Sequence, residues 1–433
     1  MGPIRQLTAL LASYGLLLLA NGMFTTLLSL RTRLEGFPTE LIGLVMGSYF
    51  LGLFLGARYG AGVVNQVGHI RAFGVFASLI SITPLVHMLL VSPTLWFVLR
   101  LIAGFSMAGL IVVTESWLNA RAEDHNRGAV LSIYMLINYL GAGSAQLLLM
   151  LDDPGGYRLF LLASITFSAS LIPVLLTRTV APLPEPPGPL RISPVLKASP
   201  VGFFGAMAAG LINASFYTMG PLSAQDAGLS ADQIALFLAC GILGGLVLQI
   251  PLGRLSDRIE RRKVIAMASV GTSLCCVALA WLVIGEVDVK WLLLGSFSYG
   301  CLAFTLYSLA GAHANDWGDP SRRMQTAGAL LAGFGIGAIV GPFLSGSAMA
   351  AMGPSGLFVF SGAVALMLAL FSIYHSARRG VAQHKPRFVP QPSTQYTSDE
   401  LYRAVQEERE GEGQQGGAAV NADAKGDRVR RRE

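Results

Sequence analysis

Long apolar stretches separated by short polar joints run along almost the whole chain. These stretches are apolar on every helical face rather than on one, which argues against the one-sided helices of a soluble protein. A helix needs about 20 residues, each rising about 1.5 Å, to cross a hydrocarbon core of roughly 30 Å. A helix also pairs its own backbone polar groups, as that core requires. The pattern predicts an all-α membrane protein with twelve transmembrane helices, at 7–30, 41–64, 72–91, 94–118, 128–150, 158–177, 200–222, 231–253, 264–285, 290–312, 324–350 and 355–377.

Composition supports a membrane location and argues against several other classes. Hydrophobic residues make up 53% of the chain and charged residues 13%, whereas soluble domains have about 25% charged residues. The net charge of +6 does not indicate a nucleic-acid partner, because the cations lie between apolar stretches and form no basic face. The four cysteines lie inside apolar stretches without C-x-x-C spacing, so no metal site or disulfide framework is predicted. The chain has no Walker sequence for ATP, and we expect no cofactor.

The distribution of Lys and Arg predicts the orientation of the helices. If the N-terminus lies in the cytoplasm, the seven segments on that side hold 18 Lys and Arg residues and the outer joints hold four. Cytoplasmic segments of membrane proteins carry such an excess of cations. The asymmetry therefore predicts a multi-pass membrane protein with both termini in the cytoplasm.

Proline-rich and hydrophilic segments divide the chain into four parts. The prolines of residues 179–199, "TVAPLPEPPGPLRISPVLKAS", predict a cytoplasmic linker between helical bundles at 1–178 and 200–377. The tail at 378–433 is too polar to bury a core. We expect it to be disordered apart from a short helix near 399–408.

The two halves of the chain match each other at an offset of 192 residues. Asn21 then falls on Asn213, and "AGVVNQVGHIR" (61–71) falls on "GRLSDRIERRK" (253–263). Two bundles of six helices in the same orientation are what an internal duplication predicts, and many transporters are built in this way.

One segment of the second half, "GRLSDRIERRK", resembles the signature of the major facilitator superfamily. That signature is a G-x-x-x-D-R-x-x-R-R/K segment between the second and third helices of a bundle. Three further segments, "GHIRAF" (68–73), "ESWLN" (115–119) and "RGAVLSIYMLINYLG" (127–141), resemble the YcaD-like branch of bacterial inner-membrane permeases. The resemblance covers roughly residues 5–378. It implies two six-helix bundles, a central substrate cavity and transport by alternating access.

The two copies of this segment predict a gate on the cytoplasmic side. A carboxylate at a helix end beside guanidinium groups can form charge-assisted hydrogen bonds that break and reform between two states. The first copy departs from the family pattern, because an asparagine replaces the acid. Its pairing is therefore expected to be weaker or built differently. The alternative is that the Lys and Arg residues of these two segments serve only to orient the helices in the membrane. The candidate gate residues are Asn65, Gly68, Arg71, Gly253, Asp257, Arg258 and Arg261.

Three ionisable residues inside predicted helices are candidates for function, because charges are costly at membrane depth. Glu115 lies near the cytoplasmic end of its helix, where it could pair with Arg71, Arg121 or Arg127 as part of the gate, carry a proton or be an inert boundary residue. Arg58 could take part in the gate or in proton coupling, or extend its side chain to the interface. Arg100 resembles the Arg-x-x-x-Gly element of many family members, which implies a role with substrate or protons. The alternative for Arg100 is a bond to a backbone carbonyl group or exposure at the outer surface.

Uncharged polar side chains in the predicted helices outline a candidate substrate site. Asn21 and Asn213 occupy equivalent places in the first and seventh helices, which line the cavity in the family that the chain resembles. Hydrogen bonds between helices are the alternative for each of these polar residues. Together with Arg100, the candidate substrate-binding residues are Asn21, Asn138, Gln146, Asn213 and Tyr217.

These observations predict a secondary transporter (permease) that moves a small solute by alternating access, with protons as a candidate coupling ion. The alternatives are a facilitator without ion coupling and a non-transporting sensor or scaffold with a transporter fold. We do not expect an enzyme, because the sequence shows no convergent His, Asp, Ser or Cys group at membrane depth. The expected partners are a small-molecule substrate and membrane lipid, and we expect a monomer.

Overall fold

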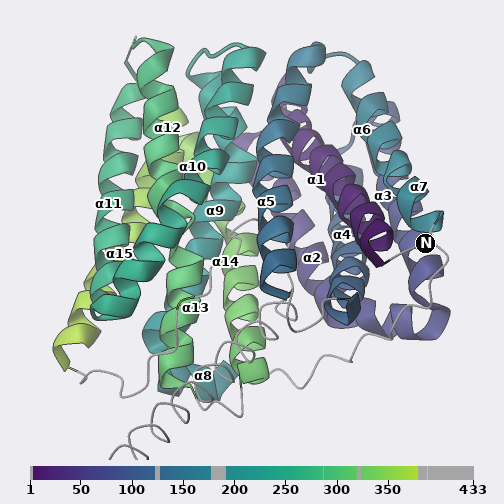
Figure 1. Ribbon diagram of the computed structural model, residues 1–433. Helices are drawn as coiled ribbons and strands as arrows, with labels where there is room; N and C mark the ends of the chain where they lie inside the picture. The colour runs from purple at the N-terminus through teal and green to yellow at the C-terminus, as the bar shows by residue number, and fades with distance from the viewer. Residues whose placement is uncertain are drawn as a thin grey trace, which may run out of the picture.

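The protein is a bundle of long helices (Figure 1). The computed structural model describes residues 3–121, 127–176, 192–285, 287–318, 323–378 and 388, and the regular elements of these residues are all helices. The first half contains α1 (Pro3–Leu34), α2 (Thr39–Val67), α3 (His69–Leu89), α4 (Pro93–Arg121), α5 (Arg127–Ala145), η1 (Gln146–Leu151), α6 (Arg158–Ala169) and α7 (Leu171–Leu175). The second half contains α8 (Ile192–Ala198), α9 (Pro200–Asp226), α10 (Ala231–Arg258), α11 (Arg261–Leu282), α12 (Val289–Ala303), α13 (Leu306–Trp317), α14 (Arg323–Met352), η3 (Gly353–Ser355) and α15 (Gly356–Arg378).

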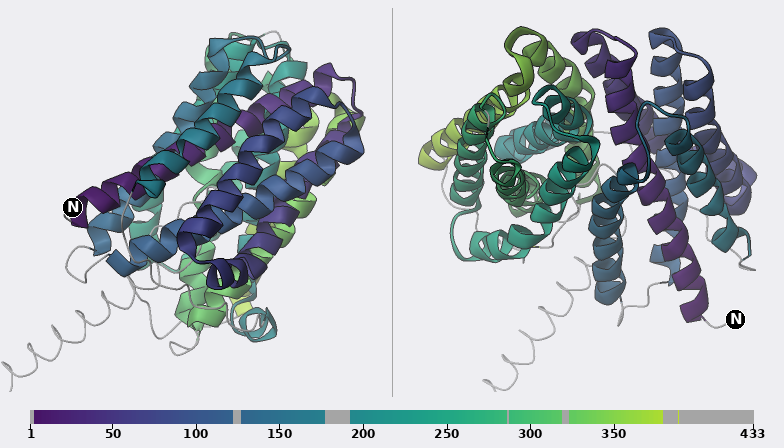
Figure 2. Two further views of the ribbon diagram at one scale, coloured as in Figure 1. Left: turned by 90° about the vertical axis from the view of Figure 1, so that its right-hand side faces the viewer. Right: turned by 90° about the horizontal axis from the view of Figure 1, so that it is seen from above.

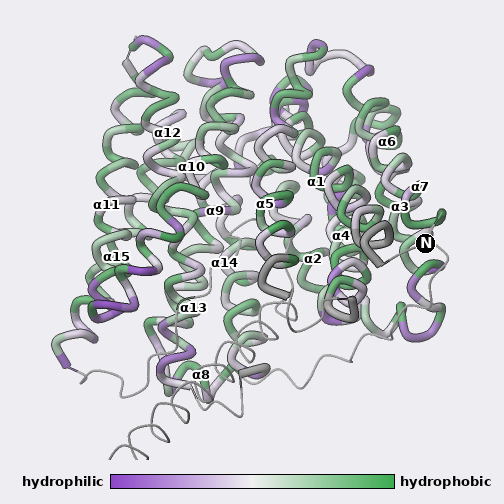
Figure 3. Tube along the Cα trace, in the orientation of Figure 1, coloured by the Kyte–Doolittle hydropathy of each residue, from purple (hydrophilic) through white to green (hydrophobic). Residues whose placement is uncertain are grey.

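The helices are long and apolar enough to cross a membrane. Eleven stretches of the described residues meet this condition, and the last of them, Gln325–Arg378, contains both α14 and α15. Figure 3 shows apolar residues along the middle of the helices and hydrophilic residues near their ends. Large apolar side chains are exposed along one stripe of α11, at Leu274, Val277 and Trp281. Such a stripe is suited to contact with lipid rather than water.

Several helices are longer than the apolar stretches that predict them. The prediction ends the second span at residue 64, and α2 continues to Val67. It ends the eighth span at 253, and α10 continues through Asp257 to Arg258. Intrahelical hydrogen bonds satisfy the backbone of polar residues as well as that of apolar ones. The segment predicted as a gate loop is therefore the last turn of α10, a two-residue break and the start of α11.

Two predicted single helices are broken in the structure. The span predicted at 158–177 divides into α6 and α7 at Ser170, and the span predicted at 290–312 divides into α12 and α13. At the second break the backbone tightens, because Thr305 donates to the carbonyl group of Leu302, three residues back. This break places the Phe304 ring at the interface with α9, as described below.

The helices form two groups, one from the first half of the chain and one from the second. Viewed from above, the helices before Leu175 lie on one side and those from Pro200 lie on the other (Figure 2). The segment predicted as a linker contains a short helix, α8, which packs against α9 and α14. The role of residues 179–199 as a linker stays a prediction. The helix predicted near 399–408 lies outside the described residues.

Candidate functional site

The two groups of helices meet tightly at one end of the molecule. Arg33 at the end of α1 donates to both carboxylate oxygens of Asp226 at the end of α9, at 3.1 and 2.9 Å. One turn earlier in α1, Ser29 donates to the carbonyl oxygen of Thr218. A Cβ added to Gly346 of α14 would lie 2.9 Å from the carbonyl oxygen of Thr39 at the start of α2. We call this the closed end, because α1 and α2 contact α9 and α14 directly there.

Contacts between the two groups continue to the middle of the helices. A Cβ added to Gly47 of α2 would lie 2.8 Å from the carbonyl oxygen of Ile339 in α14. Further along the same pair of helices, a Cβ on Gly335 would lie 3.1 Å from the ring of Phe54. Helices α5 and α10 also meet at mid-length, where Tyr139 donates to the side-chain carbonyl group of Gln249 at 2.8 Å.

Toward the other end of the molecule, α2 and α14 each carry a glycine without a close neighbour. Gly62 near the end of α2 and Gly328 near the start of α14 have no heavy atom within 4 Å of an added Cβ, leaving out their own helix backbone. Both glycines lie toward the end of the molecule that carries residues 65–71 and 254–263, which we call the gate-loop end. Contacts between the two groups are thus present at the closed end and at mid-length, whereas these two glycines toward the gate-loop end make none through an added Cβ.

A group of polar and aromatic side chains lies where α5, α9, α10 and α13 approach one another. Gln249, after accepting from Tyr139, donates to the hydroxyl group of Ser308 at 3.0 Å. Tyr217 stacks on Phe304 with ring centroids 5.4 Å apart and an interplanar angle of 5°. A Cβ added to Gly245, one turn before Gln249, would fit tightly, 3.0 Å from the Phe304 side chain and 3.1 Å from the Tyr139 ring. We call Tyr139, Tyr217, Gln249, Phe304 and Ser308 the central cluster.

The other uncharged candidates are buried in the helix bundle. Asn138 donates to the hydroxyl group of Tyr14 in α1 at 2.7 Å. Gln146 accepts from Thr26 of α1 at 2.7 Å. Asn21 and Asn213 are both buried. The hydrogen bonds of Asn138 and Gln146 join helices of the same half, so these two side chains have a structural function, and their role with substrate stays a prediction.

Glu115 belongs to a buried chain of polar groups. Its carboxylate accepts from the hydroxyl group of Tyr134 at 2.6 Å, and the Tyr134 ring stacks on Tyr14 with centroids 4.8 Å apart. The side chains of Arg121 and Arg127, two arginines expected near it, lie outside the described residues. Arg58 is exposed, with its guanidinium group 5.6 Å from the centre of the neighbouring Tyr59 ring. The assignment of Glu115 and Arg58 to a gate or to proton transfer stays a prediction.

Arg100 is fully buried between α2 and α4, which excludes the alternative of exposure at the outer surface. Its guanidinium carbon lies 4.3 Å from the centre of the Tyr49 ring. Gly104, one turn further along α4, packs directly on the backbone of Tyr49. The Arg-x-x-x-Gly spacing thus places both residues against one tyrosine of α2. A cation over an aromatic face at this distance is attracted by the ring quadrupole.

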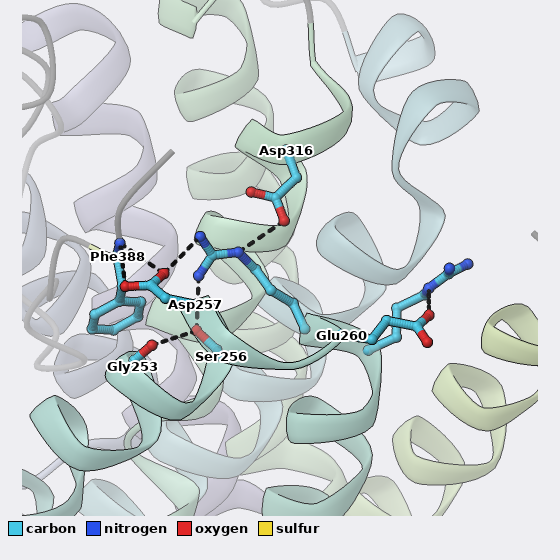
Figure 4. Close-up of polar contacts among 8 residues, drawn as sticks. Gly253, Ser256, Asp257, Glu260, Asp316 and Phe388 are labelled. Carbon is cyan, nitrogen blue, oxygen red and sulfur yellow. Dashed lines mark hydrogen bonds and ion pairs between the residues drawn. The ribbon is translucent and has the colours of Figure 1, made fainter. Parts of the chain in front are cut away.

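The second gate segment forms a buried charge cluster (Figure 4). All three nitrogens of the Arg261 guanidinium group bind an acceptor: Nε binds Asp316 at 2.8 Å, and the two others bind Ser256 at 2.7 Å and Asp257 at 3.0 Å. These contacts join the end of α10 to the start of α11 and the end of α13. Arg258 is exposed. The pairing of Asp257 with Arg261 predicted from the sequence is therefore present, and Asp316 is a further partner.

The first gate segment is built differently. His69 occupies the place of Arg261 at the 192-residue offset and stacks on Trp117, with centroids 6.2 Å apart and an interplanar angle of 6°. Asn65 and Arg71 are exposed. Gly68 joins α2 to α3 with φ of 84°, a conformation that glycine adopts more readily than other residues. The first gate segment therefore has two stacked rings at the position that the buried charge cluster of Arg261 occupies in the second gate segment.

Comparison with known proteins decides the family. The family model described as Major Facilitator Superfamily matches residues 10–222 and 202–405. The chain belongs to the Major Facilitator Superfamily.

Curated relatives and solved structures agree with this membership. The chain is 29% identical over 369 residues to the uncharacterized MFS-type transporter Ent638_1421 of Enterobacter sp. (strain 638), covering 84% of this chain and 94% of the relative. It is 28% identical over 379 residues to the uncharacterized MFS-type transporter YcaD of Salmonella typhimurium, covering 86% and 97%.

The fold is similar to that of several transporters of known structure. The nucleoside transporter NupG has a TM-score of 0.73 at 14% identity, covering 86% of this chain and all of NupG. An inward-facing, occupied bacterial homologue of the human lysosomal transporter Spinster has a TM-score of 0.69 at 16% identity, covering 88% and 98%. A structure of a proton-dependent oligopeptide transporter has a TM-score of 0.68 at 14% identity, covering 87% and 100%. As a superfamily member with spanning helices, the chain is a multi-pass membrane protein and a secondary transporter.

Sequence reasoning missed several residues that the superfamily fold brings together at the gate-loop end. Glu260 pairs with Arg262 at 2.6 Å and accepts from Ser376 of α15. Arg262 also donates to the carbonyl oxygen of His375 and lies over the Trp317 ring. The cations themselves were visible in the sequence, but their partners lie on α13 and α15, far along the chain.

Proposed function

We propose that this transporter carries an uncharged polar solute between the two halves of the bundle, and that the structure is its state open at the gate-loop end. The observation that carries the proposal is the central cluster. Its amide, hydroxyl groups and aromatic faces lie where α5 of the first half meets α10 of the second half. Hydrogen-bonding groups in an apolar wall are suited to orient a small ligand.

The arrangement of helices supports an architecture of twelve helices in two bundles. Helix α2 begins at Thr39 and α10 at Ala231, while α3 begins at His69 and α11 at Arg261, both pairs 192 residues apart. We propose bundles at 1–178 and 200–377, with the broken pairs α6–α7 and α12–α13 each counting as one crossing. The gate-loop end then lies in the cytoplasm, as the excess of cations on that side indicates.

We propose nucleosides as the first substrate class to test. They carry hydrogen-bonding groups for Gln249 and Ser308 and a flat ring for the faces of Tyr217 and Phe304. The likeness to a nucleoside transporter supports the choice. The candidates Asn21, Arg100 and Asn213, which are not part of the central cluster, remain proposals for substrate binding.

Replacing Gln249 with leucine is expected to remove ligand binding. The leucine side chain neither accepts from Tyr139 nor donates to Ser308, and a binding site built on hydrogen bonds rejects a mismatch strongly because buried polar groups are left unpaired. The measurement is a thermal-shift screen of the purified protein with nucleosides, dipeptides and other polar metabolites. A ligand at about one hundred times its dissociation constant stabilises the native state by about 2.7 kcal/mol. Ser347→Ala, at a partly exposed position of α14 whose hydroxyl group donates to Phe343 of the same helix, is the control. A ligand that stabilises Gln249→Leu as strongly as the wild type would exclude the central cluster as its site.

Replacing Arg33 with alanine is expected to open the closed end. The Arg33–Asp226 pair links α1 to α9 but is partly exposed, and such pairs contribute about 0.2–1 kcal/mol. The population open at that end is therefore expected to rise by up to about fivefold. Spin labels on cysteines introduced at Glu40 and Asp232, both exposed near the closed end, measure the distance between α2 and α10 at that end. Arg31→Ala is the matched control, because the contacts of Arg31 with Glu35, Gly155 and Phe160 all lie within the first half of the chain. Equal distances in wild type, Arg31→Ala and Arg33→Ala would contradict the proposed role of this pair.

A further inference from the structure

One residue of the polar tail is buried on the second gate segment. Phe388 is the only phenylalanine after Arg378, and its side chain is 8% exposed. Its backbone N–H donates to both carboxylate oxygens of Asp257, at 3.0 and 3.1 Å (Figure 4). Its ring lies directly on Gly253 of α10, where an added Cβ would overlap the ring. The ring fits here because Gly253 has no side chain. We call this position, formed by Gly253 and Asp257, the seat of Phe388.

This seat is joined to the charge cluster of the gate. Asp257 binds the Arg261 guanidinium group at 3.0 Å as well as the Phe388 amide. The Asp257 side chain is 31% exposed, so water can replace the amide without leaving a buried charge unpaired. A contact of this kind is suited to form and break during a transport cycle.

The Phe388 ring also lies on the face of α10 that α5 contacts further along. Gly245 and Gln249 contact Tyr139 of α5, and Gly253 follows Gln249 by four residues. Residues four apart lie on the same face of a helix. If α5 were to approach α10 at the gate-loop end, it would meet the Phe388 ring on this face.

The first half of the chain has no equivalent seat. At the 192-residue offset, Ala61 replaces Gly253 and Asn65 replaces Asp257. The alanine supplies the methyl group that the ring seat excludes, and the asparagine lacks the charge that receives the amide. The seat is therefore specific to the second gate segment.

We propose that Phe388 is a reversible wedge that holds the gate-loop end open and must leave its seat before that end can close. The ring and amide of the tail bind the open state and are displaced by α5 in the closed state. A group that binds one of two states shifts the equilibrium toward it. The tail thereby sets the balance between the two states of the transporter. This inference rests on the proposed alternating-access function.

The test measures gate closure in the full-length protein. Spin labels on cysteines at Gln66 and Lys263, both exposed at the gate-loop end, report the distance between the halves after the four native cysteines are replaced. Phe388→Ala removes the ring, and Gly253→Ala fills its seat. Gly62→Ala is the matched control, because a methyl group there contacts nothing within 4 Å. Both test variants are expected to raise the ratio of short to long distances by about tenfold relative to wild type and control.

The outcomes separate the wedge from the transport mechanism. Unchanged or longer gate-loop distances in Phe388→Ala and Gly253→Ala, with Arg33→Ala still altering the distances, would overturn the wedge and leave alternating access in place. If Arg33→Ala also altered neither label pair, the alternating-access proposal itself would fail, and the wedge with it. A shift in Phe388→Ala that Gly62→Ala does not share supports the wedge.

Discussion

Replacing Arg261 with alanine is expected to lower the free energy of unfolding by about 3–5 kcal/mol, the usual cost of breaking a buried ion pair. The Arg261 side chain is 1% exposed and that of its partner Asp316 is 2% exposed. Without the guanidinium group, Asp316 keeps a buried charge that has lost its principal counter-ion, and Ser256 loses its donor. Unfolding of the purified protein by SDS titration in mixed micelles measures the change.

Lys263→Ala is the matched control for Arg261→Ala. Lys263 lies two residues away on the same helix, is exposed and pairs with Glu260 at 3.8 Å. Its removal is expected to change stability by less than about 0.5 kcal/mol. A loss for Arg261→Ala no larger than that of the control would show that the cluster does not stabilise the fold. The variant Asp316→Asn keeps the shape of the partner and is expected to be affected less than Arg261→Ala.

Replacing Gly104 with alanine is expected to destabilise the first half by about 3 kcal/mol, the upper end of the usual cost of overpacking. A Cβ at this position would overlap the carbonyl oxygen of Tyr49 and lie 2.8 Å from the nitrogen of Leu53. The obstacle is helix backbone, which cannot rotate aside as a side chain can. Helices α2 and α4 must therefore separate, and the Arg100 guanidinium group loses its position over the Tyr49 ring.

Gly62→Ala gives the comparison, because the same change is made in α2 where nothing contacts the new methyl group. Glycine inside a helix costs about 0.5–1 kcal/mol relative to alanine, so this variant is expected to be as stable as the wild type or slightly more stable. The two variants should therefore differ in the sign of their effect. Similar melting temperatures for Gly104→Ala and wild type would contradict the close approach of α2 and α4.

The spanning helices could be predicted from the sequence because the hydrocarbon core of the membrane requires helical structure. In a hydrocarbon core the backbone must be hydrogen-bonded within the segment, so each long apolar stretch predicts a helix regardless of its neighbours. The lengths of α2 and α10 beyond their apolar stretches, and the breaks at Ser170 and Phe304, did not follow in this way. They depend on local hydrogen bonds and on the packing of the rings beside them.

In the candidate site too, some contacts could be predicted from the sequence and others could not. The Asp257–Arg261 pair could be predicted because its members are four residues apart, where helical geometry brings side chains together. Asp316, Ser376 and Phe388 lie 55 or more residues from their partners in the gate cluster, and no local pattern marks them as neighbours. The same holds for Tyr139 and Gln249, which come from different halves of the chain.

The sequence by itself determined the helices, their apolar surfaces and the resemblance to the family, because these depend on residue type and short spacing. Only the tertiary structure decided which end of the bundle is closed, which polar side chains meet at its centre and which residues complete the gate. Those features depend on contacts between helices that are distant in the chain, and one sequence carries no direct record of such contacts.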